Sequence, residues 1–344
     1  MKRIKIAQIG VGHDHAPAAI QTLKLLDKAG IYELVGYCVL PEDSGNVPEN
    51  YESNKGLYKD VKQMSLEELL NYKGLDAVAI ETEDRALTKY ALMAAEKGLH
   101  IQMDKPGSPN LFDFEKLVKI VKEKNLVFNV GYMYRFNPKI IEALERIKQG
   151  EIGEVYCVEA HMNCEYGPEK RRWLGQFPGG MLYYLGCHLV DLVHLIMGEP
   201  EEVIPLSCAT GFGGVDTQDY GMAAFKYKNG ISFVKSCSSE AGGYMRRQLV
   251  ICGSKGTIEF KPLETFEKGA PRDWLYTKMR VTHAWQGWQH YEPKVQSEYY
   301  NRFNDMLKSF ADSVKGRIEN PYTADYELTT YKLLLKACGV DING

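Results

Sequence analysis

The type and position of Lys105 suggest that this residue has a chemical role. It follows a short apolar segment, Leu99 to Met103, and precedes Pro106, which fixes its own φ and pushes Lys105 towards an extended conformation. The amine is therefore expected to point in one direction, as a donor to a developing alkoxide must. A Lys-Pro pair taken alone is more often an exposed turn. Here the pair comes after a glycine-rich turn and before a Gly-Gly…His segment, and that order favours a catalytic role.

A second group of polar residues lies in the second half of the chain. The run from Gly179 to His194 has helical spacing, and Tyr184, His188 and Asp191 fall on one face of it at i, i+4 and i+7. A lone histidine in a helix usually packs or is solvated, but three polar side chains on one face of an apolar helix need partners or a function. Because an unperturbed histidine ionises near pH ~6.5, His188 is the best general base among them.

The residues at the start of the chain form a nucleotide-binding pattern. A strand, a tight turn and a helix are predicted in succession at residues 4–9, 10–12 and 16–28. Gly10 permits the turn, and Gly12 lets the backbone approach a pyrophosphate that the helix N-terminus attracts. The third glycine of the usual pattern is replaced by His15. No metal is predicted at His13 and His15, since two histidines in one loop lack the further ligands that a site needs.

Strands alternate with helices through the first part of the chain. Further strands are predicted at residues 33–39, 77–80, 99–103 and 126–132, and helices at 65–72, 85–97 and 111–124. This alternation predicts a parallel, doubly wound sheet. The ligand crevice of such a sheet lies at the carboxyl ends of its strands, where Gly10, Thr82 and Lys105 fall.

The end of the second predicted strand bears on the choice of cofactor. An acidic residue there normally holds the adenosine ribose, but this position is Val39. Glu42 or Asp43 could reach back from the following loop, or the ribose could be held differently. No arginine stands there to receive a 2′-phosphate. The sequence therefore predicts NAD as the cofactor, with NADP not excluded.

After residue 150 the pattern changes to consecutive strands. They are predicted at residues 155–161, 202–208, 220–227, 231–238, 247–252 and 257–261, with helices at 137–148, 299–314 and 326–337. Short turns such as Lys228-Asn229-Gly230 between the strands indicate an antiparallel sheet. The expected fold is an N-terminal Rossmann domain with a doubly wound parallel sheet, residues 1–128. A C-terminal α+β domain follows, residues 129–344, with a large open, mostly antiparallel sheet and flanking helices.

The composition is that of a globular protein, with 44% hydrophobic and 25% charged residues among 344. The net charge of -3 gives no reason to expect nucleic acid or a membrane surface as a partner. We find no signal-peptide core and no apolar run long enough to cross a bilayer. None of the eight cysteines forms a Cys-x-x-Cys pair, and most lie in apolar runs, which indicates reduced thiols in a cytoplasmic protein.

The chain resembles the Gfo/Idh/MocA oxidoreductases, typified by glucose–fructose oxidoreductase and inositol dehydrogenase, over nearly its whole length. The motifs that carry the resemblance are Gly10-Val11-Gly12, Asp104-Lys105-Pro106, Gly131-Tyr132 with Arg135-Phe136-Asn137-Pro138, Gly179-Gly180 with Gly186-x-His188-x-x-Asp191, and Gly253-Ser254-Lys255-Gly256. The resemblance implies that Lys105 touches the nicotinamide and the substrate, and that His188 accepts a proton. It also implies a homodimer or homotetramer.

Three positions depart from the pattern of this family. Tyr184 stands where a catalytic aspartate is frequent, and Val39 where an acidic ribose anchor is usual. Thr82-Glu83-Asp84 replaces the usual Thr-Pro-Asn. These departures bear on the substrate, the cofactor and the reaction rather than on the fold.

We therefore expect an NAD(P)-dependent oxidoreductase that acts on a secondary alcohol of a sugar or cyclitol. Two alternatives stay open: an NAD-retaining glycosidase or lyase that oxidises the sugar transiently, and a non-catalytic sensor that binds the cofactor. The expected catalytic residues are Lys105, His188 and Tyr184. The expected cofactor-binding residues are Gly10, Gly12, His13, His15, Thr82, Asp104, Lys105 and Pro106. The expected substrate-binding residues are Tyr132, Arg135, Arg172, Trp173 and Asp191.

Overall fold

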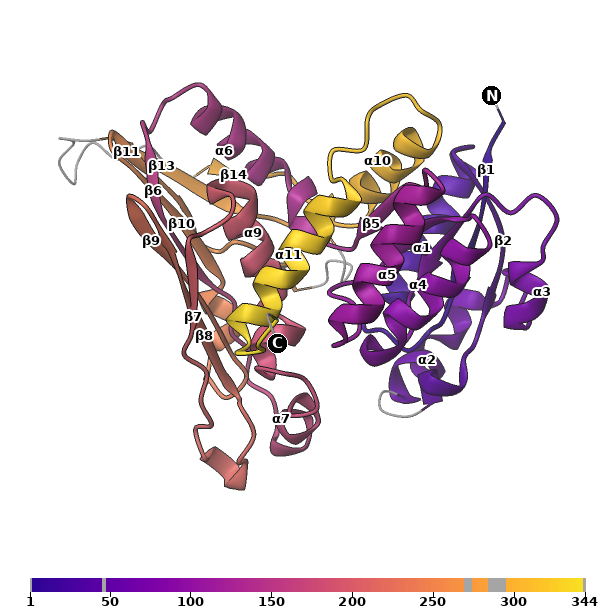
Figure 1. Cartoon of the computed structure of the whole chain (residues 1–344), viewed down its shortest axis with the longest axis horizontal. Coiled ribbons are helices and arrows are strands. Elements are labelled where there is room, and N and C mark those ends of the chain that lie inside the picture. The colour runs from indigo at the N-terminus through magenta and orange to yellow at the C-terminus, as the bar shows by residue number, and fades with distance from the viewer. Residues whose placement is uncertain (1, 45–47, 269–273, 284–294, 343–344) are drawn as a thin grey trace. The chain divides into compact units, whose positions relative to one another are not determined.

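The computed structural model describes residues 2–44, 48–268, 274–283 and 295–342. The chain forms two compact units (Figure 1). Unit 1 comprises Met1–Met133 with Phe303–Leu328, and unit 2 comprises Tyr134–Arg302 with Thr329–Gly344. Within the described ranges, no helix combines the length and the apolar character needed to cross a membrane.

Unit 1 is built on a five-stranded sheet in which every neighbouring pair is parallel. Its strands are β1 (Ile4–Ile9), β2 (Tyr32–Cys38), β3 (Ala77–Ile80), β4 (His100–Met103) and β5 (Phe128–Val130). The order β2-β1-β3-β4-β5 reverses direction between β1 and β3, and sheets of this kind bind their ligands at the carboxyl ends of the strands at such a point. The predicted doubly wound parallel sheet is confirmed.

The helices of unit 1 follow the predicted alternation with the strands, apart from α2, which lies in a segment expected to be a loop, and α10, which comes from far along the chain. They are α1 (Ala16–Lys28), α2 (Pro48–Asn54), α3 (Leu66–Leu70), α4 (Leu87–Glu96), α5 (Leu111–Glu123) and α10 (Asn304–Val314). Ser65 begins α3 as its N-cap and forms a reciprocal capping box with Glu68. The helices α4 and α5 pack against each other (Figure 1).

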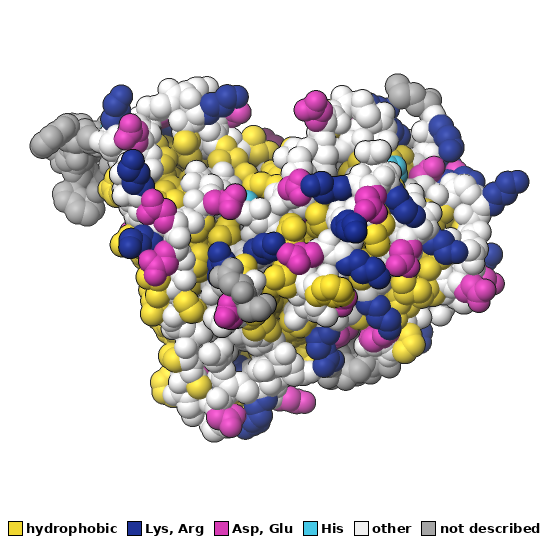
Figure 2. Space-filling model, in the orientation of Figure 1, with side chains coloured by type: hydrophobic (Ala, Val, Ile, Leu, Met, Phe, Trp, Pro, Cys, Tyr) yellow, Lys and Arg dark blue, Asp and Glu magenta, His cyan; other side chains and the backbone are white. Residues whose placement is uncertain are grey.

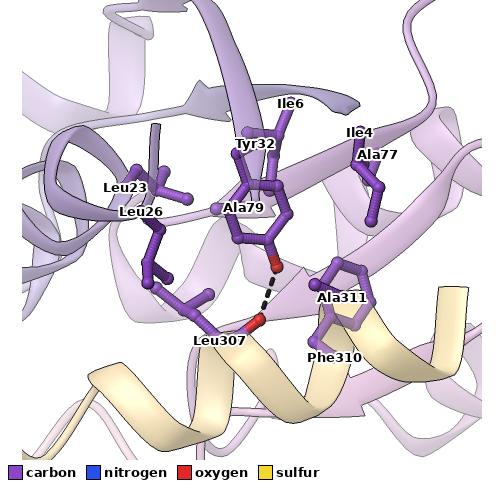
Figure 3. Close-up of a cluster of buried hydrophobic side chains, with 10 residues drawn as sticks. All are labelled: Ile4, Ile6, Leu23, Leu26, Tyr32, Ala77, Ala79, Leu307, Phe310 and Ala311. Atoms are coloured by element: carbon purple, nitrogen blue, oxygen red, sulfur yellow. Dashed lines mark hydrogen bonds between the residues drawn. The ribbon is translucent and has the colours of Figure 1, made fainter. Parts of the chain in front are cut away.

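The helix α10 covers the sheet of unit 1 although it lies far along the chain. Its Leu307, Phe310 and Ala311 pack with α1 and with strand residues such as Ile6 and Ala79 (Figure 3). This arrangement differs from the predicted division at residues 128 and 129. The apolar spacing of α10 predicts a buried helix face, but such a pattern does not specify which core the face enters.

Unit 2 contains an eight-stranded sheet in the order β14-β13-β11-β10-β6-β9-β8-β7. Its strands are β6 (Val155–His161), β7 (Glu202–Pro205), β8 (Tyr220–Tyr227), β9 (Gly230–Cys237), β10 (Gln248–Gly253), β11 (Gly256–Phe260), β13 (Lys278–His283) and β14 (Val295–Gln296). All neighbouring pairs are antiparallel except β6 with β9. The prediction of a mostly antiparallel second sheet is confirmed.

The helices of unit 2 include α8 (Met181–Tyr184) and α9 (Cys187–Met197), which both pack on its sheet. Further helices are α6 (Pro138–Lys148) and α7 (Pro168–Leu174), and α11 (Ala324–Ala337) begins in unit 1 and ends in unit 2. A two-stranded sheet joins β12 (Trp274–Leu275) to β15 (Tyr300–Asn301). On the face drawn in Figure 2, acidic and basic side chains are interspersed, in agreement with the small net charge.

Tyr32 ties α10 to the sheet of unit 1, and its removal should measurably destabilise the protein. Its buried hydroxyl donates a hydrogen bond of 2.6 Å to the carbonyl oxygen of Leu307 (Figure 3). Tyr32→Phe leaves that acceptor without its donor, so we expect the free energy of unfolding in urea to fall by about 1–3 kcal/mol. Tyr156→Phe is the control, since Tyr156 is 47% exposed. Equal stability of the two variants would show that this bond contributes nothing.

Candidate active site

The Gly10-Val11-Gly12 turn is bonded to a carboxylate that arrives from beyond β2. Asp43 accepts hydrogen bonds from the amides of Val11 (2.9 Å) and Gly12 (3.0 Å), and from the amide of Leu40 (2.8 Å). The Thr82 hydroxyl donates to it as well, at 2.7 Å. A Cβ atom at Gly12 would lie 2.6 Å from Asp43 Oδ1, so only glycine admits this carboxylate. Asp43 therefore reaches back to the turn, and it does so by binding the turn's own amides.

A buried cluster of histidines and carboxylates lies beside this turn. His13 and His15 follow β1, and Asp104 follows β4. Asp104 Oδ2 lies 3.2 Å from His13 Nδ1 and 3.0 Å from His15 Nδ1, while Asp84 Oδ1 lies 3.5 Å from His13 Nε2. Glu81 is buried at the end of β3 and interacts with Asp104. Parallel strands end at one edge of the sheet, and this edge brings the five side chains together.

Burial and neighbouring charges set the protonation of the cluster. Burial lowers the pKa of His15 to about 4 against the opposing effect of Asp104, so His15 is neutral at pH 7. Burial also lowers the pKa of His13, but Asp104 and Asp84 outweigh it and the net pKa is raised. Asp104 remains ionised, because His13 and His15 overcome the effect of burial and lower its pKa. Burial and the charge of Asp104 raise the pKa of Glu81.

Lys105 lies inside this edge of the sheet rather than on an exposed turn. It is 2% exposed, and its backbone amide donates to Asp104 Oδ1 at 2.6 Å. Its ammonium group is close enough to lower the pKa of both Asp84 and Asp104. Pro106, which follows it in a cis peptide bond, is also buried, as is Tyr132 beyond the end of β5.

The helix predicted from Gly179 to His194 is wrong, because the structure has two helices there. The helix α8 ends at Tyr184 and α9 begins at Cys187. Between them the backbone tightens, and the His188 amide donates to the carbonyl of Leu185 instead of that of Tyr184. The predicted i, i+4 relation of Tyr184 to His188 therefore does not hold as helix geometry. His188 and Asp191 both stay on α9, one turn apart.

The glycine pair before α8 has a packing role. Gly180 has φ +53°, and a Cβ atom there would lie 2.0 Å from the carbonyl oxygen of Gln218. The backbone can take this conformation and this close approach only with glycine. The pair thus sets where α8 starts against the strand that carries Tyr220.

Arg135 and Asp191 form a buried ion pair in unit 2. Arg135 Nε donates to Asp191 Oδ1 at 2.9 Å, and its Nη2 donates to the same oxygen at 2.7 Å. The side chains are 1% and 0% exposed. Both were predicted to bind substrate, yet here each is bonded to the other and enclosed. Their geometry supports a role in holding α9 in place.

His188 is buried on α9 and packs edge-on against Tyr134, with the ring centroids 5.0 Å apart. A second histidine of α9, His194, binds Thr330 Oγ1 through Nδ1 at 2.8 Å. Burial and the nearby charge of Arg135 lower the pKa of His194 to about 4, so it stays neutral at pH 7. Of the two, His188 lies nearer the start of α9.

Tyr184 belongs to an aromatic cluster at the junction of α7 and α8. Its ring is perpendicular to that of Trp173 at 5.5 Å and packs against Phe177 at 6.3 Å. The Lys170 ammonium lies over the rings of Trp173 (3.8 Å) and Tyr184 (4.8 Å). Arg172, predicted to form a substrate wall with Trp173, is exposed and donates to the carbonyl of Gly214.

Two family models match the chain, and they divide it much as the structure does. Residues 4–132 match an oxidoreductase family with an NAD-binding Rossmann fold. Residues 140–259 match the GFO/IDH/MocA C-terminal domain. The chain belongs to the GFO/IDH/MocA family. The resemblance predicted from the motifs is thereby confirmed.

Curated relatives within the GFO/IDH/MocA family act on different compounds. The chain is 27% identical to 2,7-anhydro-N-acetylneuraminate hydratase of Escherichia coli (strain K12), over 70% of this chain and 65% of the relative. It is 23% identical to myo-inositol 2-dehydrogenase of Thermotoga maritima, over 74% of each. It is 27% identical to D-xylose 1-dehydrogenase (NADP(+)) 2 of Haloferax volcanii, over 47% of this chain and 50% of the relative. Several matches thus span less than two thirds of the relative's length.

Solved structures of the GFO/IDH/MocA type share the fold at low sequence identity. A putative NADPH-dependent oxidoreductase from Desulfitobacterium hafniense matches with a TM-score of 0.78 at 19% identity, covering 98% of this chain and 95% of that one. Aldose-aldose oxidoreductase from Caulobacter crescentus matches with a TM-score of 0.76 at 18% identity, covering 98% of both. At these identities the likeness establishes the fold alone.

Sequence reasoning missed several members of the two clusters. Asp84 and Glu81 were noted only as part of a loop, because an acidic run after a strand carries no distinguishing pattern. Lys170 was also missed, although its spacing of three residues from Trp173 in a helix puts the two side chains on one face. That spacing was the available signal.

The Arg135–Asp191 pair gives a direct test of the positioning role. Asp191→Asn and Arg135→Met each leave a buried charge without its partner, so we expect each to destabilise the protein by about 3–5 kcal/mol. The double variant Arg135→Met with Asp191→Asn should cost less than the sum of the single changes, as urea unfolding would show. Additive costs would mean that the pair has no coupling and that Asp191 is free to serve another role.

Proposed function

We propose that this chain is an NAD(P)-dependent oxidoreductase that transfers a hydride between the nicotinamide and a secondary alcohol of a sugar or cyclitol. The observation that carries the proposal is the buried Lys105, held by Asp104 at the carboxyl edge of a sheet that belongs to an NAD-binding Rossmann family. The sugar and cyclitol dehydrogenases among the relatives support the substrate class.

The residues of the first turn fit a dinucleotide. Gly10 has φ +87°, the chain reverses direction between β1 and β3, and α1 begins directly after the turn. An acidic residue, Asp43, lies against Gly12 after β2, as a ribose anchor requires. Its oxygens already accept four hydrogen bonds from the protein, so a ribose hydroxyl would replace one of these donors. His13, His15, Thr82 and Pro106 complete the proposed cofactor-binding set.

Each catalytic residue has a separate task in this proposal. A bound nicotinamide would supply the hydride acceptor. His188 takes the proton of the substrate hydroxyl, and Lys105 donates to the same oxygen and stabilises its developing charge. Trp173, Arg172 and Tyr132 contact the substrate, and Arg135 with Asp191 holds α9, which carries His188.

A relative named as a hydratase keeps a second candidate function under consideration. The 27% identity to 2,7-anhydro-N-acetylneuraminate hydratase extends over 70% of this chain. The second candidate is an enzyme that keeps its NAD and oxidises the sugar only transiently while a group is eliminated or added. Net formation of NADH with a free sugar would support the first function. Product formation without net NADH would support the second.

We further propose a cytoplasmic homodimer or homotetramer. Cysteines 38, 157, 164, 187, 208, 237, 252 and 338 are all free thiols, which supports a reducing compartment. Light scattering coupled to size-exclusion chromatography would measure the mass, and a monomer at micromolar concentration would contradict the oligomer.

Lys105 and His188 should both be essential for turnover. Lys105→Met and His188→Gln are each expected to lower kcat about a hundredfold or more, because each removes a group that acts on the reacting oxygen. Lys119→Met is the control, since Lys119 is 75% exposed. As Lys105 is buried among carboxylates, Lys105→Arg, which keeps the charge, separates loss of catalysis from loss of folding. Near-normal kcat in Lys105→Met would refute its role.

Tyr184→Phe tests whether the phenol takes part in the reaction. The ring contacts with Trp173 and Phe177 and the overlying Lys170 remain in this variant, so only the hydroxyl is lost. We expect kcat to fall by roughly tenfold to a thousandfold, the range for one acid–base or hydrogen-bonding group, with cofactor affinity unchanged. An unchanged kcat would show that Tyr184 serves only as part of the aromatic cluster.

NAD should be preferred over NADP by a modest factor, about tenfold. The carboxylate of Asp43 lies at the turn where a 2′-phosphate would approach, and it would repel that phosphate. The nearby Lys89 ammonium is already bonded to Glu42 at 2.6 Å, so it is less able to pair with the phosphate. Fluorescence titration with NADH and NADPH measures the preference, and Asp43→Asn should reduce it. Tighter binding of NADPH by the wild type would contradict this assignment.

A further inference from the structure

His13, His15 and Asp104 have the donor atoms and spacing of a metal site. One nitrogen or oxygen from each lies within 4.8 Å of the other two. Two imidazoles and one carboxylate suit ions such as Zn²⁺, Co²⁺ and Fe²⁺. Sequence reasoning set a metal aside because two loop histidines lacked further ligands. The fold supplies the missing ligand, Asp104, from the end of a different strand.

Two distances within the cluster agree with ligands around one ion, namely those that join Asp104 to each histidine. Bonds of about 2.0–2.1 Å to nitrogen or oxygen place neighbouring ligand atoms roughly 2.9–3.4 Å apart in octahedral or tetrahedral geometry. Asp104 Oδ2 lies 3.2 Å from His13 Nδ1 and 3.0 Å from His15 Nδ1. The His15 amide also approaches His13 Nδ1, at 3.1 Å, so an ion at this nitrogen would take the place of that donor.

The groups around the three ligands also match a metal centre. Histidines that bind a metal usually donate their other ring nitrogen to a carboxylate, which fixes the ring. His13 Nε2 lies 3.5 Å from Asp84 Oδ1. The Asp104 carboxylate is oriented in turn by the Lys105 amide, at 2.6 Å. His15, whose side chain is 13% exposed, leaves a route for an ion to enter.

We propose that His13, His15 and Asp104 bind one divalent transition-metal ion of the Zn²⁺ class, with Asp84 orienting His13. Three protein ligands leave at least one coordination position for water or an oxygen-bearing ligand. His13 and His15 also belong to the proposed cofactor-binding set, but the metal proposal rests on ligand geometry within unit 1, and its test does not measure turnover.

Metal titration of the whole protein tests the proposal without any assay of activity. Chelator-treated protein is titrated with Zn²⁺ by calorimetry and with Co²⁺ by visible absorption. We expect one ion per chain and a cobalt spectrum of nitrogen and oxygen ligands. His15→Gln and Asp104→Asn should each weaken Zn²⁺ binding at least tenfold, and Asp84→Asn about tenfold.

Two controls separate this site from others in the chain. His161→Gln changes a half-buried histidine of β6, and Cys157→Ser disrupts a second possible cluster formed by Cys157, Glu159 and Cys252. Both variants should bind Zn²⁺ as the wild type does. If Asp104→Asn fails to fold by circular dichroism, the more accessible His15→Gln carries the test.

Three results would overturn the proposal. The first is no saturable binding of Zn²⁺ or Co²⁺ by the wild type, which would leave His13 as a protonated bridge between carboxylates. The second is undiminished binding in a folded His15→Gln variant. The third is a thiolate-to-cobalt band that disappears in Cys157→Ser, which would place the ion at the cysteines.

Discussion

The structure of unit 1 depends on hydrogen-bond donors and charged partners for the carboxylates that are buried where its parallel strands end. Asp43 and Asp104 are each 4% exposed, and an unpaired charge at that depth would cost several kcal/mol. Asp43 is stabilised by three backbone amides and one hydroxyl, and Asp104 by two histidines and the Lys105 amide. The same contacts set the position of the first turn and of Lys105, so stability and the proposed chemistry share their residues.

Unit 2 also contains a buried carboxylate, which is stabilised in a different way. The charge of Asp191 is matched by one bidentate arginine, and both groups are excluded from solvent. A buried pair of this kind contributes little net stability but strongly penalises alternatives in which either partner is alone. It therefore suits a helix that must hold His188 in one orientation. The aromatic cluster around Tyr184 has the Lys170 ammonium over its rings, and its Trp173 is partly exposed.

Several departures of this chain from the family pattern lie at the carboxyl ends of the strands of unit 1, where charged and ionisable side chains gather. His13 and His15 in the first turn, Asp104 after β4 and Asp84 after β3 together make a cluster that binds a proton or, as we propose, a metal ion. The turn still has the glycine conformation and the helix start that a dinucleotide requires. The metal proposal and the oxidoreductase proposal are tested by different measurements, so either can fail alone.

The sequence by itself determined the elements and their class. Strand periodicity, the turn at Gly10 and the alternation of strands with helices depend on local interactions, and these predictions agree with the structure. The tertiary structure determined which residues pair with each other over long separations in the sequence. Asp43 bonds to Gly12, Asp104 meets His15, Arg135 meets Asp191, and α10 packs on the first sheet. The break between α8 and α9 was also decided there, as was the start of α8, where Gly180 fits against Gln218. The sequence pattern indicates which residues are expected to be buried or paired. Which partner each residue has depends on how the strands are ordered in space.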